Sequence, residues 1–400
     1  MKNRTRCFRC AYPLAVKFSG ANLLAVAAFC LAHITIANAQ TPSVKTCSAF
    51  AADGTLATGT LDKGELDTRL TIPGTRAKVI HTAIGNAWGC ELGFSADGKW
   101  LTSVLTAEKL TIQILNVKEN ELHRQFSSEW HTFHNMALEP GYGFRFLGGF
   151  AADDSIILWR YVPEDGPTPN DASILHLHYQ RWSIEGELTS DQDLGLLGFA
   201  GRGGRGPILG PEAKQFWIPW GEDGYQHYRF DDDRAVSQGT LTLPKDNSSM
   251  PSYLSTMHRF LTVLGDKTKQ RAALLDDTGK IDSEIDLPFF PNLLNSVVPD
   301  WFYVRHLVRS ADDRFIAIGR SRVAWVLIDT DRDWGSEILV LDTHSFKVFS
   351  TLKVGLGGIQ SLAIDHREGK IRLVGYWRGR WHDIAKDEQG RSDWRESHGS

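Results

Sequence analysis

Alternate acids between residues 329 and 337 are the strongest candidate for metal chemistry in this sequence. Asp329, Asp331, Asp333 and Glu337 take positions 1, 3, 5 and 9 of the segment DTDRDWGSE, between two predicted strands. Calcium prefers six to eight hard oxygen ligands, and alternate carboxylates in a turning loop can point inward together. The segment therefore predicts a calcium-binding hairpin. The alternative is a solvated acidic tip without metal, since Trp334 stands where such loops have glycine.

Two histidine pairs and one glycine-rich segment are weaker candidates. His131 and His134 are three residues apart, a spacing that does not place them on one face of a strand. His176 and His178 are two apart and would share a face, but the sequence identifies no third ligand for zinc. Residues 201–206 (GRGGRG) have dinucleotide-loop spacing, yet Pro207 excludes the helix that such a loop requires. We interpret the histidines as ordinary strand or loop residues and the glycines as a flexible loop.

The sequence offers no candidate for a catalytic nucleophile. No G-x-S-x-G elbow occurs, so we assign no catalytic residue and no organic cofactor. Cys47 and Cys90 are the only cysteines after residue 39, and an even pair in an oxidising compartment predicts a disulfide. The alternative is two unpaired buried cysteines.

The first 39 residues predict export. Five basic residues precede an apolar stretch at residues 22–36, and Ala37-Asn38-Ala39 follows, which is the order of a cleavable signal peptide. We predict cleavage between Ala39 and Gln40 and a secreted or periplasmic protein, the alternative being an uncleaved N-terminal anchor. The remainder has 39 basic residues against 48 acidic ones, a balance that argues against nucleic-acid binding. No later segment is apolar enough to insert in a membrane.

The elements that must position these residues are revealed by an internal repeat. The segments FAADG (50–54), FSADG (94–98), FAADD (150–154) and RSADD (309–313) each precede a short apolar run. Weaker copies lie near residues 211, 255 and 365, so the markers are 44 to 60 residues apart. This spacing suits four-stranded blades with connections of varying length.

The repeat predicts an all-β fold, a β-propeller of seven blades with four antiparallel strands each. Predicted strands include residues 55–60, 99–105, 155–161, 215–220, 259–265, 314–319 and 371–377, which are rich in branched and aromatic residues. Six or eight blades are alternatives, because only residues 392–396 offer a fourth strand for the last blade. The expected domains are a signal peptide (1–39), the propeller (40–386) and a polar, disordered tail (387–400).

Two blades carry a family resemblance. Residues 94–101 (FSADGKWL), followed by residues 112–117 (IQILNV), look like a WD-repeat-type blade. Residues 338–343 (ILVLDT) and 347–355 (KVFSTLKVG) resemble the secreted bacterial propellers of the YVTN type. The chain departs from WD repeats because no Trp-Asp pair ends a strand and no Gly-His pair opens a blade. The resemblance implies a propeller that presents its top face and channel to a ligand.

The function predicted from these features is that of a monomeric binding scaffold. The expected partner is a protein, a glycan or a small-molecule ligand, with loops at residues 163–171 and 200–211 rimming one face. The alternative is a propeller enzyme, a lactonase-type or glycan-cleaving hydrolase with a metal or paired acids at the channel mouth. Tryptophans are expected mainly between blades, and those nearer loops are candidates for a glycan platform: Trp130, Trp301, Trp334 and Trp381.

Overall fold

The computed structural model of the chain consists of strands and turns in all the residues that it describes. These residues are 44–83, 87, 89–106, 109–128, 147–151, 153–163, 174–198, 207–210, 214–220, 224–231, 234–265, 269–288, 300–326, 330–355, 358–389 and 395–396. They form seven antiparallel sheets of four strands, each sheet made from four consecutive strands of the chain. The all-β prediction is therefore confirmed.

The seven sheets are the blades of a β-propeller. Blades 1 to 3 contain β1 (Lys45–Phe50), β2 (Leu56–Asp62), β3 (Glu65–Thr71), β4 (Lys78–Ala83), β5 (Gly89–Phe94), β6 (Trp100–Thr106), β7 (Leu110–Asn116), β8 (Glu121–Ser128), β9 (Leu147–Phe150), β10 (Ile156–Pro163), β11 (Ile174–Trp182) and β12 (Leu188–Gly198). Blades 4 and 5 contain β13 (Ile208–Leu209), β14 (Gln215–Trp220), β15 (Gly224–Asp231), β16 (Arg234–Thr242), β17 (Ser252–Leu254), β18 (Arg259–Gly265), β19 (Gln270–Leu275) and β20 (Ile281–Asp286). Blades 6 and 7 contain β21 (Asp300–Arg309), β22 (Phe315–Val326), β23 (Thr330–Asp342), β24 (Lys347–Gly355), β25 (Ser361–Arg367), β26 (Lys370–Trp377), β27 (Arg380–Asp387) and β28 (Arg395–Glu396).

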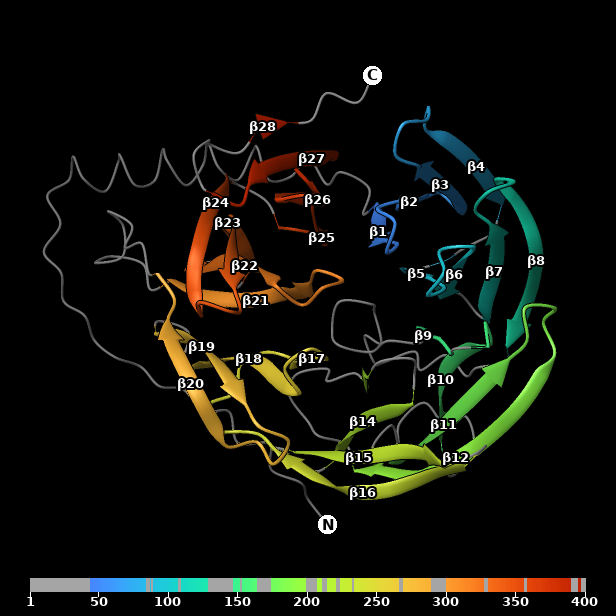
Figure 1. The fold of residues 1–400 in the computed structure, drawn as a ribbon, viewed down its shortest axis with the longest axis horizontal. Coiled ribbons are helices and arrows are strands. Elements are labelled where there is room, and N and C mark those ends of the chain that lie inside the picture. The colour runs from blue at the N-terminus through green and yellow to red at the C-terminus, as the bar shows by residue number, and fades with distance from the viewer. Residues whose placement is uncertain are drawn as a thin grey trace, which may run out of the picture. The chain divides into compact units, whose positions relative to one another are not determined.

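The blades close into a ring through their first strands. Each first strand contacts the first strand of the next blade, in the order β1, β5, β9, β13, β17, β21 and β25, and β25 contacts β1 (Figure 1). The prediction of seven blades is confirmed, and among the described strands none is shared between the first and last blades. The fourth strand of blade 7, β28, lies inside the 392–396 segment.

The repeated sequence forms the turn between the first and second strands of a blade. In blades 1, 2, 3 and 6 the N–H of its last residue donates to the carbonyl three residues earlier, at 2.9 to 3.1 Å. That last residue has a left-handed backbone, with φ of 84° at Gly54, 71° at Gly98, 63° at Asp154 and 57° at Asp313. The preceding aspartate accepts an N–H two residues on, as Asp53 does from Thr55 at 2.8 Å. Glycine and aspartate recur here because both suit such a turn.

These turns also join neighbouring blades. Asp313, fully buried in blade 6, accepts hydrogen bonds from Ser255 Oγ at 2.6 Å and from the Thr256 N–H at 2.9 Å, both in the corresponding turn of blade 5. His366 of blade 7 donates through Nδ1 to Asp312 of blade 6 at 2.7 Å. The turn of blade 6 therefore fixes its own hairpin and also contacts the turn regions of blades 5 and 7. We call this end of the ring the turn face, and the opposite end the loop face.

The hydrophobic core lies between the blades. Buried apolar clusters join blades 1 and 2, blades 2 to 4, blades 4 and 5, blades 5 and 6, and blades 6 and 7. Trp159 and Trp217 are almost fully buried, which confirms for them the predicted role of tryptophan between blades. Burial of such large rings contributes several kcal/mol of stability in total, at about 25 cal/mol for each Å² removed from water.

The seam between blades 7 and 1 is more polar than the other junctions. Ser48 Oγ and Ser361 Oγ are 2.7 Å apart, and Trp381 Nε1 donates to Thr60 Oγ1 at 3.0 Å. The guanidinium of Arg372 lies over the Phe50 ring, 5.4 Å from its centre. Among the described residues, no buried apolar cluster spans this seam. Ring closure therefore depends on a few specific contacts.

A disulfide fastens the first blade to the second. Cys47 of β1 and Cys90 of β5 are bonded, with their Cα atoms 5.7 Å apart, so the predicted pairing is confirmed. Both residues lie on innermost strands, within a small buried cluster that also contains Leu61, Leu66 and Leu105. The bond anchors blade 1 on the side away from the polar seam. The described residues include no helix with the length and apolar character needed to cross a membrane.

We predict that Asp313→Ala lowers the free energy of unfolding by about 3 kcal/mol, because charged hydrogen bonds to a buried carboxylate contribute roughly 1.5–3 kcal/mol each. Asp154→Ala is the matched control, since Asp154 holds the same left-handed turn position in blade 3. Asp154→Ala is expected to lower the free energy of unfolding by only about 1 kcal/mol, which is the backbone penalty that both variants share. Urea unfolding measures both values, and equal losses would contradict an interblade role for Asp313.

We predict that Cys47→Ser with Cys90→Ser lowers the free energy of unfolding by roughly 4 kcal/mol, the chain-entropy value for a separation of 43 residues. Thermal unfolding with and without dithiothreitol checks this value. Reductant should lower the melting temperature of the unmodified protein and leave that of the double variant unchanged. A melting temperature that reductant does not move in either protein would contradict the prediction.

Candidate functional site

The predicted calcium segment lies in the long hairpin of blade 6. The sequence places residues 329–337 in a loop, but the structure assigns residues 330–337 to β23, which pairs with an extended β22. Pairing reaches as far as Val326 and Thr330, with one register shift between Arg322 and Val323, so paired strands replace most of the expected loop. Asp329 lies outside the described residues, as do the side chains of Asp331 and Asp333. The calcium site stays a prediction.

Glu337, the fourth member of that set, forms a buried ion pair. Its Oε1 accepts from the Arg320 guanidinium on β22, and Arg320 also donates to Gln270 Oε1 at 3.2 Å. Arg320 is 1% exposed, and burial lowers its pKa while Glu337 opposes that shift. Since Gln270 begins the third strand of blade 5, this pair joins blades 5 and 6. Arg320 therefore neutralises the charge that Glu337 would contribute to a calcium site.

The histidines of blade 3 are the predicted residues that the structure brings into a defined polar arrangement. His176 and His178 share one face of β11, as their spacing predicts, and each meets a carboxylate on β12. His176 Nδ1 lies 2.8 Å from Asp193 Oδ2, and His178 Nδ1 lies 2.7 Å from Asp191 Oδ1. We call these four residues the histidine ladder. His131 and His134 lie outside the described residues.

The ladder continues along the same face of β11 toward blade 2. Gln180 Nε2 donates to Asp191 Oδ2 at 2.9 Å, and Ser128 Oγ, at the end of β8, donates to Gln180 Oε1 at 3.1 Å. Asp193 also accepts the Gly195 N–H at 2.8 Å. Burial raises the pKa of Asp193, but this N–H and His176 outweigh burial and lower it overall. Asp193 is therefore a stable anionic acceptor for His176.

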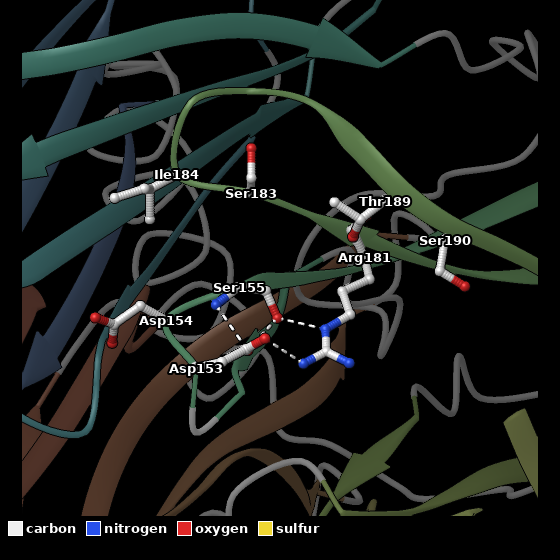
Figure 2. Close-up of a pocket in the computed structure, with 8 residues that line it drawn as sticks. All are labelled: Asp153, Asp154, Ser155, Arg181, Ser183, Ile184, Thr189 and Ser190. Atoms are coloured by element: carbon white, nitrogen blue, oxygen red, sulfur yellow. Dashed lines mark hydrogen bonds and ion pairs between the residues drawn. The ribbon is translucent and has the colours of Figure 1, made fainter. Parts of the chain in front are cut away.

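A hollow of about 450 Å³ lies at the other end of blade 3, on the turn face. Its lining comes from the first turn of the blade and from the β11–β12 hairpin: Asp153, Asp154, Ser155, Arg181, Ser183, Ile184, Thr189 and Ser190 (Figure 2). Arg181 donates to Ser155 Oγ and to Asp153 Oδ2, both at 2.6 Å. The guanidinium is thus held against the turn rather than presented to a ligand.

The pKa values of the two neighbouring acids of the hollow are shifted in opposite directions. Burial opposes the charge of Asp153, but hydrogen bonds from Arg181 and Ser155 outweigh it and lower its pKa to about 2. Burial, followed by the negative charge of Asp97, raises the pKa of Asp154. Figure 2 shows the Asp154 carboxylate pointing away from Arg181 and Asp153. These two carboxylates therefore do not converge on one point as a paired acid and base would.

Metal-binding clusters of three or more His, Cys, Asp or Glu side chains are absent from the described part of the chain. Of the four candidates for a glycan platform, Trp381 has a described side chain. It packs edge-on against Tyr376, 5.4 Å between ring centres, and bonds Thr60 at the seam, so it serves packing. Trp220, predicted to pack between blades, is instead 48% exposed at the loop-face end of β14. Trp220 is the last residue of its strand, and about half of its side chain is exposed to solvent.

Sequence reasoning did not identify Asp191, Asp193 or Arg181 as site residues. A signal for the first two is present, because Asp191-x-Asp193 has the same alternation as His176-x-His178 in the preceding strand. Two alternating polar pairs on adjacent antiparallel strands predict cross-strand partners. The partner of Arg181 is 28 residues away in a different turn, and no local pattern indicates it.

Comparison with known proteins supports the fold alone. No protein-family model matches the chain, and no curated protein matches it significantly. Among solved structures, KlHsv2 with loop 6CD replaced by a Gly-Ser linker is similar with a TM-score of 0.50 and 11% identity, over 89% of this chain and 98% of that chain. The β-propeller domain of Cps50 (Swd1) from Myceliophteria thermophila has a TM-score of 0.49 and 10% identity, over 85% and 95% of the two chains.

We predict that Asp153→Asn flattens the acid dependence of stability. Because the folded pKa of about 2 lies below the ordinary 3.8, ionised Asp153 stabilises the fold above pH 4, and this contribution is lost as pH falls toward 2. The Asp153 side chain is 60% exposed, so the loss at pH 7 should stay under about 1 kcal/mol.

Asp154→Asn is the matched control and should act in the opposite direction. Since the folded pKa of Asp154 is raised, its charge is disfavoured, and the neutral amide should leave stability at pH 7 unchanged or higher. Urea midpoints between pH 2 and 7 measure both effects. A steeper acid loss for Asp153→Asn than for the unmodified protein would contradict the assignment.

Proposed function

We propose that this chain is an exported β-propeller that acts as a binding scaffold, with its ligand held at the loop face. The observation that carries the proposal is the difference in chain length between the two ends of the ring. On the turn face, the first and second strands are joined by tight turns such as 51–55 and 95–99. At the loop face, β8 ends at Ser128 and β9 begins at Leu147, β10 ends at Pro163 and β11 begins at Ile174, and β12 ends at Gly198 and β13 begins at Ile208.

This distribution is what a binding scaffold requires. A rigid ring fixes the ends of its connections, while their sequences can vary without disturbing the blades, and recognition residues concentrate in such segments. The fold by itself does not select a ligand, because propellers host unrelated functions. We therefore retain all three ligand classes that the sequence predicts: a protein, a glycan or a small molecule.

Trp220 is the candidate on this face for contact with a ligand, and its side chain is described. Its ring is 48% exposed at the end of β14, next to the connection at residues 221–223. Exposed tryptophan at a binding surface supplies apolar area together with an indole N–H donor. The carbohydrate and protein ligands that we propose both use aromatic rings in this way.

Export is supported by the Cys47–Cys90 disulfide and by the signal-like order of residues 1–39. Disulfides form and persist in oxidising compartments, which favours a secreted or periplasmic protein. The acidic balance of the chain fits a soluble partner rather than a nucleic acid. The proposal also includes a bacterial origin, because two blades resemble those of secreted bacterial propellers of the YVTN type.

We predict that ligands of the protein bind through the loop face. Glycan and peptide arrays would be probed with the unmodified protein, with Trp220→Ala, and with residues 164–171 replaced by a Gly-Ser linker of equal length. Binding should weaken at least tenfold in one or both variants, because hot-spot aromatics contribute about 2 kcal/mol or more.

Val236→Ala is the matched control, since Val236 is 43% exposed on β16, toward the turn face. It should leave binding unchanged. A ligand lost with Val236→Ala and retained by both loop-face variants would contradict the proposal. Turnover of an array compound, rather than retention, would replace it with the hydrolase alternative.

A further inference from the structure

We propose that the histidine ladder of blade 3 binds a borderline divalent transition metal, Cu²⁺, Ni²⁺ or Zn²⁺, through the Nε2 atoms of His176 and His178. This inference is independent of the proposed scaffold function. It stands on the cross-strand pairing of two imidazoles with two carboxylates, each pair joined at 2.7 or 2.8 Å.

The carboxylates determine which nitrogen of each ring is available. An ionised carboxylate accepts hydrogen bonds only, so the Nδ1 facing Asp193 or Asp191 must carry the proton. In the neutral imidazole, Nε2 then holds the lone pair that a metal requires. Metal-binding histidines commonly have this arrangement, with one nitrogen on the metal and the other on a carboxylate.

The spacing of the two rings allows one ion to reach both. Residues i and i+2 of a strand project from the same face roughly 6.5–7 Å apart. Both Nδ1 atoms bond to carboxylates of β12, which leaves both Nε2 atoms outside these two hydrogen bonds. Metal–nitrogen bonds of about 2.0–2.1 Å require only that the rings tilt toward each other. The histidine side chains are 25% and 23% exposed, which gives an ion access from solvent.

The chemistry of the ladder selects the metal class. Imidazole ligands suit copper, nickel and zinc, whereas calcium and magnesium prefer oxygen ligands. Two anionic carboxylates beside two neutral rings add a favourable negative field for a cation. With two protein ligands, the remaining coordination positions are open to water or to a donor group of a bound molecule. The expected order of affinity places Cu²⁺ above Ni²⁺ and Zn²⁺.

The two faces of β11 differ in polarity. The equivalent third strand of blade 5, β19, buries apolar side chains on both faces, including Ala272, Ala273 and Leu274. In β11 the face toward blade 4 is apolar, with Leu177 and Tyr179 buried, while the face toward blade 2 carries the histidines and Gln180. The corresponding end of β19 carries Arg271, which pairs with Glu284 of β20, so a cross-strand ion pair occurs there too, but without histidine.

The test is titration of the tag-free, full-length protein with Cu²⁺, Ni²⁺ and Zn²⁺ at pH 7.5, followed by calorimetry. Free thiols are alkylated first, because Cys7, Cys10 and Cys30 are themselves potential ligands. We expect one site per chain, and electron paramagnetic resonance of the Cu²⁺ form should show two imidazole nitrogens. Calcium should not compete.

Variants separate the ligands from their supports. His176→Ala and His178→Ala should each weaken binding at least tenfold, and Asp191→Asn and Asp193→Asn should weaken it about tenfold. His81→Ala is the matched control, because His81 donates to Asp67 at 2.6 Å in the same cross-strand manner but without a second histidine. Circular dichroism and melting temperatures confirm folding of each variant.

The outcomes are distinct. Loss of the site in both His176→Ala and His178→Ala, with its retention in His81→Ala, supports the proposal. Retention of full affinity in His176→Ala or His178→Ala overturns it, as does an equal loss in His81→Ala, which would indicate scattered binding to exposed histidines. A copper spectrum with one nitrogen or none would also overturn the shared site.

Discussion

The structure depends on one recurrent constraint, the left-handed residue that ends the turn between the first and second strands of a blade. In four blades this residue closes a hydrogen bond to the carbonyl three residues earlier, which fixes the angle at which the first strand meets the second. Where the residue is Asp313, its carboxylate also captures Ser255 and the Thr256 N–H of the preceding blade. A single local conformation therefore sets both the hairpin and its relation to a neighbour.

The junctions between blades differ in the kind of contact that stabilises them. Between most blades, apolar side chains interlock, and area buried from water supplies the stabilisation. The junction of blades 7 and 1 has hydroxyl, indole and guanidinium contacts instead. None of the described strands is exchanged across this seam, and on its other side blade 1 is bonded to blade 2 through Cys47–Cys90. The covalent link stands beside the junction where packing contributes least.

Blade 3 concentrates the polar chemistry of the described chain. Its turn-face end holds Arg181 against Asp153 and Ser155, so the charges of Arg181 and Asp153 neutralise each other. Its loop-face end holds the histidine ladder, in which the carboxylates orient the rings and leave Nε2 as the basic nitrogen. The same residue types thus support folding in one place and a binding site in the other, and hydrogen-bond geometry distinguishes the two.

The sequence by itself determined the fold, because turn chemistry is local. The four clear repeats each place aspartate and a residue tolerant of positive φ before an apolar run, and even the weaker copies near residues 211, 255 and 365 mark first-to-second strand turns. It also determined the disulfide and the shared face of His176 and His178. Only the tertiary structure decided what depends on distant partners. Glu337 meets Arg320 and Gln270, Trp220 lies exposed, and Asp191 and Asp193 face the histidines. These contacts follow from cross-strand register and blade packing, which no short segment encodes.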